Sequence, residues 1–181
     1  SPDQIYYEAA HPYNVAFNHH ILVEGRRQVQ QYLGSYPHRQ VRLYEIPRYH
    51  DPVYAFPQGN AISELEGWIA ATTGLREKAY LHLTIGSALG QHWIQQHLQL
   101  AHVQGLDMLR QALPEALGMQ LVKDVYGEEA VAELREQKMK LYHKERFNDP
   151  NGQPPLLYAD GKDYLEINLG ALTLYDWSQE L

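Results

Sequence analysis

The stretch KAYLHLTIGSALGQHW, residues 78–93, decides the fold, because it is the least polar part of the chain and repeats with the period of a helix. Its large apolar residues recur at intervals of four: Leu81, Ile85, Leu89 and Trp93. Gly86 and Gly90 also lie four residues apart and leave a groove where a second backbone can approach closely. We therefore predict a central helix from Lys78 to about Gln104, with another helix crossing it at these glycines.

Helical periodicity flanks the central segment on both sides. The patterns cover residues 12–33, 63–74, 106–113, 115–126 and 128–147. They are followed or separated by residues that stop helices, namely Gly34, Gly74, Pro114 and Gly127. Ser63, with Glu66 three residues later, fits a capping box at the start of the second pattern. We expect about five or six helices in total.

Residues 41–46 alternate with the period of a strand instead. Val41 and Leu43 share one side of this run, Arg42 and Tyr44 share the other, and Pro47 follows it. The pattern predicts a short strand whose apolar side faces the helices.

The C-terminal part of the chain also changes its period. Asp160-Gly161 is typical of a type I′ turn, and a two-residue loop there pairs Leu156 with Leu165. A hairpin needs a third strand or a helix beneath it, and the strand at residues 41–46 can supply that support. The predicted fold is therefore α+β and mostly helical, with the helices packed on a small antiparallel sheet that includes this C-terminal hairpin.

Length and composition indicate one globular domain, residues 1–181, large enough to bury a core without disulfide staples. The chain has no cysteine, which excludes disulfides, thiolate metal sites and thiol nucleophiles. Its net charge of -7 argues against a nucleic-acid partner, because phosphate affinity depends on clustered lysine and arginine. No apolar run is long enough for a membrane span. We expect a soluble, cytoplasmic protein.

The chain contains 10 histidines, which raises the question of a metal site. His92, His97 and His102 lie five residues apart on the central helix, so they point in three directions and cannot converge on one ion. His92 shares the face of Ile85 and Leu89, which predicts a buried, hydrogen-bonded histidine.

A smaller set of residues leaves the metal question open. His20 and Glu24 lie four residues apart on the predicted first helix, a spacing that suits a first-row metal, although a surface pair has the same spacing. The alternative interpretation of the chain is a metal-dependent enzyme, an oxygenase or hydrolase, with a transition metal held by histidines and a carboxylate. Its candidate ligands are His11, His20, Glu24, His50 and His92.

The usual enzyme motifs are absent from the sequence. It has no G-x-S-x-G elbow, no G-x-x-x-x-G-K-[ST] phosphate loop and no G-x-G-x-x-G after a strand. Its 14 tyrosines are instead typical of surfaces that bind partners. Our leading hypothesis is a non-enzymatic binding or accessory domain that recognises a protein or peptide by strand addition at a sheet edge. The outward-facing residues at that edge are Arg42, Tyr44, Tyr164 and Glu166.

Overall fold

A computed structural model of the chain describes residues 1–7, 14–46, 54–56, 61–65, 74–98, 103–159 and 161–180. Its strands are β1 (Gln4–Tyr6), β2 (Arg42–Ile46), β3 (Tyr54–Phe56) and β4 (Ala61–Leu65). Its α-helices are α1 (Val15–Leu33), α3 (Leu75–His97), α4 (Leu106–Asn148) and α5 (Ala171–Gln179). The short 3₁₀-helix η1 (Leu156–Tyr158) and the π-helix η2 (Tyr164–Gly170) precede α5.

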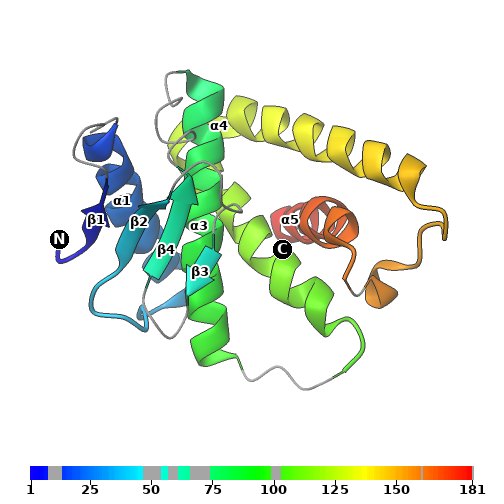
Figure 1. Ribbon diagram of the computed structural model, residues 1–181, viewed down its shortest axis with the longest axis horizontal. Helices are drawn as coiled ribbons and strands as arrows, with labels where there is room; N and C mark the ends of the chain where they lie inside the picture. Colours follow the sequence, from blue (N-terminus) through cyan, green and yellow to red (C-terminus); the bar gives the residue numbers. More distant parts are fainter. Residues whose placement is uncertain are drawn as a thin grey trace.

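The described strands form one sheet in the order β1-β2-β4-β3. β1, β2 and β4 run parallel, and only β3 is antiparallel to its neighbour. The predicted antiparallel sheet is therefore wrong. Parallel neighbours need a long crossover, and α1 supplies it between β1 and β2. Figure 1 shows the sheet on one side of the long central helix α3, with α1 beside it.

The predicted C-terminal hairpin is also wrong, because residues 156–179 form η1, η2 and α5. Gly161 does adopt the positive φ that the turn requires, at 74°. However, β2 already has β1 and β4 on its two edges, so it offers no edge to a further strand. Leu165, Leu172 and Tyr175 are buried and also fit a helical period, and the helix buries them against α4.

Two further local predictions fail. Ser63 does not cap a helix, because it lies inside β4, where it pairs with Tyr44 of β2. Pro114 does not end a helix, because it lies in the ninth position of α4. Pro114 is buried against α3, where its Cα lies 3.5 Å from the position of a Cβ on Gly90. Of the five or six helices expected, the described residues contain four α-helices.

The core between the sheet and the helices follows from the patterns in the sequence. Leu43 and Ile62 are fully buried on one face of the sheet and pack against α1 and α3. The buried residues of the two helices in this core are Ile21, Leu22, Val29, Leu81, Ile85, Ala88 and Leu89. The apolar side of the strand at residues 41–46 thus faces the helices, as predicted.

α4 bends at Gly127, where the backbone leaves the helical conformation with φ 80° and ψ -176°. The sequence predicted two helices separated at this glycine, and the break confirms that boundary. A second core fills the inside of the bend, where α3, both halves of α4 and α5 meet. Figure 1 shows α5 lying between the two halves of α4. Among the described residues, no helix is long and apolar enough to cross a membrane.

The glycines of the central helix lie at a close helix crossing, as predicted. A Cβ on Gly86 would lie 3.5 Å from the Cα of Gly118 in α4. In turn, a Cβ on Gly118 would lie 2.9 Å from the carbonyl oxygen of Leu83 and 2.7 Å from Oγ of Ser87. The two backbones approach so closely that neither helix has room for a side chain at this point.

Replacing Gly118 with valine is expected to lower the free energy of unfolding by about 1–3 kcal/mol, because the side chain forces the two backbones apart. Urea unfolding followed by circular dichroism measures the loss. Gln111→Val is the control, since it places the same side chain on an exposed position of the same helix. Equal stability of the two variants would contradict the close crossing.

Candidate functional site

An apolar groove of about 500 Å³ lies where the ends of α1 and α3 meet the first half of α4 and α5. Four helices that are far apart in the sequence build it. The lining consists of Tyr32, Leu33, Trp93, Ile94, Leu98, Leu113, Ala116, Leu117, Gln120, Leu174, Trp177, Ser178 and Gln179. None of these residues carries a formal charge, so the groove suits an uncharged, apolar occupant.

The groove exists because two helices have apolar residues outside their buried stripes. α4 buries Ala112 and Ala116 in the core, while Leu113 and Leu117, one position along, stay half-buried. On α5, Tyr175 is buried in the core, whereas Trp177 is 61% exposed. Large apolar side chains at such positions leave apolar surface that the chain does not cover by itself.

Trp93 forms a fixed wall of the groove. Its Nε1–H donates a hydrogen bond to the carbonyl oxygen of Ser35 at 3.1 Å. The ring of His97 stacks on the indole, with ring centroids 4.4 Å apart and planes 15° apart. The indole is therefore held on both its polar edge and one face, which preorganises it for contact with a ligand.

A hydrogen-bonded network forms the polar rim of the groove. The Tyr32 hydroxyl donates to the Asp124 carboxylate at 2.9 Å, and the Gln120 amide donates to the same carboxylate at 3.0 Å. Gln179 connects α5 to this network, donating to Gln120 and accepting from Lys123. Burial, and then the hydrogen bond to Asp124, raise the pKa of Tyr32, so this hydroxyl stays protonated and keeps its hydrogen bond to Asp124.

The rim is connected to a buried histidine in the core. Gln28 donates to the carbonyl oxygen of Leu121 at 3.1 Å and lies 3.5 Å from the Asp124 carboxylate. Its Oε1 lies 3.0 Å from Nε2 of His82, and an amide oxygen can only accept, so Nε2 carries the hydrogen. Burial lowers the pKa of His82 to about 4. This histidine is therefore neutral at pH 7, and it holds the Gln28 amide that lies beside Asp124.

The structure places two of the predicted partner-binding residues on the sheet face opposite the core. Arg42 and Tyr44 are half-buried, while Leu43 between them is fully buried. The Tyr44 ring stacks on Tyr6 of β1, with centroids 4.7 Å apart and planes 9° apart. Strand addition at β2 is excluded, however, because both of its edges are already paired.

The other two predicted partner-binding residues lie in η2 rather than in a strand. The hydroxyl of Tyr164 donates to the Asp149 carboxylate at 2.8 Å. Glu166, predicted to face outward, is only 2% exposed and accepts a hydrogen bond from the Gly161 N–H at 2.9 Å. Burial raises the pKa of Glu166. The helical backbone turned this side chain inward, so Glu166 is not a surface residue.

The described candidate metal ligands do not converge. His20 is exposed, and Glu24 pairs with Arg27 on its own helix. His92 is fully buried, as predicted: its Nε2–H donates to the Ala61 carbonyl oxygen at 3.1 Å and its Nδ1 accepts from the Tyr36 hydroxyl at 3.0 Å. His11 and His50 lie outside the described residues. Within the described ranges, no group of three histidine or carboxylate side chains could hold a metal ion.

The sequence pattern does not predict the groove: Trp93 belongs to the apolar repeat of the predicted central helix, and no helix is predicted at Trp177. A signal was present, since Leu174 and Trp177 lie three residues apart and continue the helical period after Gly170. No pattern in the sequence predicts that α5 packs beside the ends of α1 and α3.

The chain matches no protein-family model, no curated protein and no solved structure.

Proposed function

We propose that this protein is a binding domain that takes an amphipathic helix of a protein partner into the apolar groove. The observation that carries the proposal is the uncharged lining, to which three large, exposed side chains contribute: Tyr32, Leu98 and Trp177. Tryptophan and tyrosine dominate the binding energy of many protein interfaces, because they bury a large area with little loss of side-chain freedom.

Two features favour a helix over a small molecule. Small-molecule sites enclose most of their ligand, whereas here the indole of Trp177 is 61% exposed and lies at the surface. The walls of the groove are themselves helices, and a helix with apolar residues at positions i, i+3, i+4 and i+7 fits such a groove. The amide and hydroxyl groups of the rim can then pair with the polar flank of that helix.

Charge favours a basic flank on the partner. Asp124 and Glu180 are exposed next to lining residues, and neither forms an ion pair within the described part of the chain. The chain as a whole carries a net charge of -7. A helix with lysine or arginine beside its apolar face is therefore attracted to the groove and an acidic one is repelled. The cysteine-free sequence suits a reducing compartment such as the cytoplasm.

Synthetic peptides test this function. The probe is a labelled helical peptide of about four turns, with leucine on one face and lysine on the other. Trp177→Ala is expected to weaken its binding at least ~10-fold, since hot-spot truncations cost about 2 kcal/mol or more. Fluorescence anisotropy measures the affinity, and a thermal melt should show little change because Trp177 is mostly exposed.

Matched controls separate the groove from general attraction between opposite charges. Val125→Ala truncates an exposed apolar residue of α4 outside the groove lining and should leave the affinity unchanged. A scrambled peptide of the same composition, with leucines spread around the helix, should bind weakly, and a peptide with glutamate in place of lysine should bind less well than the basic one. If Trp177→Ala and Val125→Ala bind the basic peptide equally, or if no peptide binds, the proposed function is wrong.

A further inference from the structure

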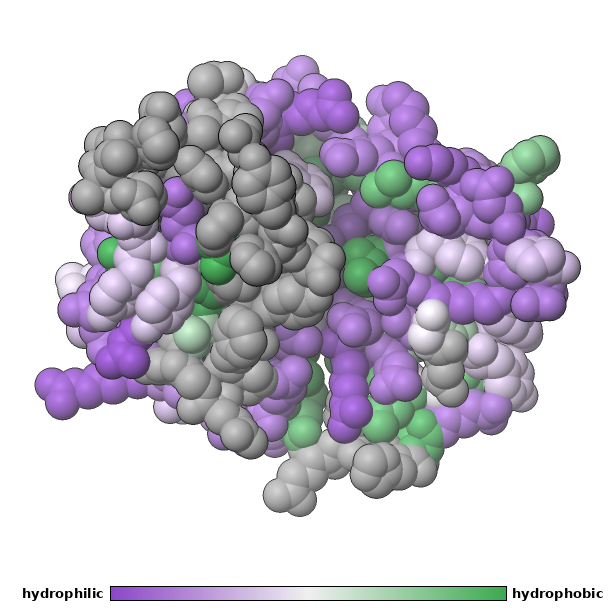
Figure 2. Space-filling view, viewed as in Figure 1, coloured by the Kyte–Doolittle hydropathy of each residue, from purple (hydrophilic) through white to green (hydrophobic). Residues whose placement is uncertain are grey.

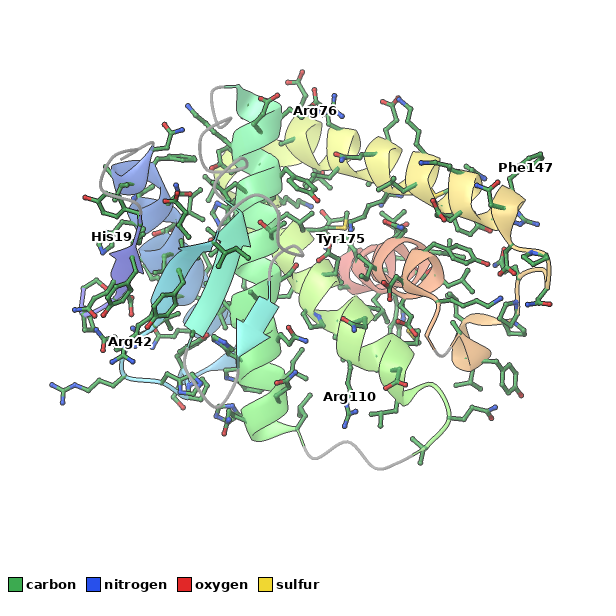
Figure 3. All side chains as sticks on the ribbon, viewed as in Figure 1. His19, Arg42, Arg76, Arg110, Phe147 and Tyr175 are labelled. Carbon is green, nitrogen blue, oxygen red and sulfur yellow. The ribbon has the colours of Figure 1, made fainter. Side chains whose placement is uncertain are left out.

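The far end of α4 presents an apolar side chain to solvent. Phe147 is 91% exposed, the largest exposed fraction among the described large apolar residues. We define residues 140–148 as the α4 tip. Figure 3 shows Phe147 there, pointing away from the rest of the molecule, and Figure 2 shows the surrounding surface as hydrophilic. The tip is part of a well-formed helix, so the exposure of Phe147 is a property of the fold.

The face of the α4 tip that carries Phe147 bears two lysines. At helical spacing, residues i, i+3, i+4 and i+7 share one face, and here they are Lys140, His143, Lys144 and Phe147. All four are exposed; Lys140 forms an ion pair with Glu136, whereas Lys144 forms none within the described residues. Phe147 is the one large apolar side chain on this face, so the tip offers the groove a single aromatic anchor flanked by lysine rather than a full apolar stripe.

We propose that the α4 tip of a second copy of this chain inserts Phe147 into the apolar groove, with Lys144 next to the acidic rim. This inference rests on the proposed function and adds a second, weaker occupant of the groove, because the tip supplies one aromatic anchor and not the apolar stripe of a partner helix. The charges of the two surfaces are complementary, because Asp124 and Glu180 at the rim lack ion pairs in the described part of the chain and so does Lys144 on the tip.

The tip of a molecule does not occupy the groove of the same molecule, because Phe147 is 91% exposed and is not part of the groove lining. Leu113 and Leu117 in the first half of α4 line the groove, whereas Phe147 lies at the end of the second half. The contact is therefore between molecules and joins two different surfaces head to tail.

The size of the contact sets its strength. One helix tip in one groove buries less than the roughly 800 Å² per partner of a standard stable complex. A concentration-dependent equilibrium follows, in which a partner helix with better contacts displaces the second copy. Self-association then regulates access to the groove.

Light scattering coupled to size-exclusion chromatography, over a range of protein concentrations, tests the proposal. The wild type should gain mass as its concentration rises, while Phe147→Ala and Trp177→Ala should each associate at least ~10-fold more weakly. Phe147→Ala keeps an intact groove and Trp177→Ala keeps an intact tip. An equal mixture of the two should therefore form a complex of two chains that grows no further, because only one compatible pair of surfaces remains.

Further variants serve as controls. Val103→Ala truncates an exposed apolar residue outside the lining and should associate like the wild type. Lys144→Glu should weaken association, and adding Glu180→Lys in the same chain should restore part of it. The inference is overturned if the wild type stays monomeric at all concentrations, if Phe147→Ala associates like the wild type, or if the mixture stays monomeric. Peptide binding is measured separately, so a monomeric wild type that binds the basic peptide refutes the self-contact and leaves the proposed function standing.

Discussion

Replacing Lys138 with methionine is expected to lower the free energy of unfolding by about 3–5 kcal/mol, the cost of leaving one charge of a buried pair without its partner. Lys138 is 5% exposed and forms an ion pair with Glu115 across the inside of the α4 bend. Its Nζ also donates to the carbonyl oxygen of Ile167 in η2 at 3.1 Å. Ser87 of α3 donates to the other Glu115 oxygen, so one ion pair joins α3, both halves of α4 and η2.

Urea unfolding at pH 7 measures this loss of stability. Two further variants show whether it comes from the buried ion pair. Lys140→Met breaks an exposed ion pair with Glu136 on the surface of the same helix and should cost less than ~1 kcal/mol. Adding Glu115→Gln to Lys138→Met removes the orphaned carboxylate and should recover part of the stability. If Lys138→Met costs no more than Lys140→Met, the buried pair does not hold the bend.

Acidification is expected to destabilise the protein through His82 and His92. Burial is the main cause that lowers the pKa of each to about 4, from 6.5 in the unfolded chain. The unfolded chain therefore takes up protons first as the pH falls. Above pH 6.5 both histidines are neutral in the folded and the unfolded chain, so the stability does not depend on them. Between pH 6.5 and about 4 the free energy of unfolding decreases, and below about 4 it decreases no further on account of these residues. A shift of this size corresponds to about 3 kcal/mol per histidine.

The charges around the two histidines act in different directions. Glu24 and Asp124 raise the pKa of His82 and His20 lowers it, but burial outweighs all three. For His92, the neighbouring His38 lowers the pKa further, and the hydrogen bond to Ala61 raises it. Both rings are thus held in the neutral form at pH 7.

Urea unfolding at a series of pH values from 4 to 7 measures the effect, with His82→Gln and His92→Gln as the controls. A glutamine amide can donate to Gln28 in place of His82, and it can both donate to Ala61 and accept from Tyr36 in place of His92. The double variant should lose much less stability than the wild type between pH 6.5 and 4. The same pH dependence in both proteins would show that the histidines are not the cause.

The local pattern of the sequence was enough to predict the helices around the core. The four-residue repeat of Leu81, Ile85 and Leu89 predicted the central helix, and Gly86 and Gly90 predicted its close crossing. Gly127 predicted the break in α4. Each of these features depends on residues within one or two turns of a helix, where the period and the missing Cβ act directly. The buried position of His92 followed from the same period.

The pairing of the strands and the apolar groove were decided only by the tertiary structure. The two edges of β2 are filled by β1 and β4, so the C-terminal segment could not pair with that strand, and Leu165 is buried by helical packing on α4 instead. The groove depends on α5 packing beside the ends of α1 and α3. This is a long-range contact that no short stretch of sequence predicts. Local periodicity determines which residues share one face of a helix or strand. Long-range contacts determine which of these faces pack together and which remain exposed, as the face of Trp177 does.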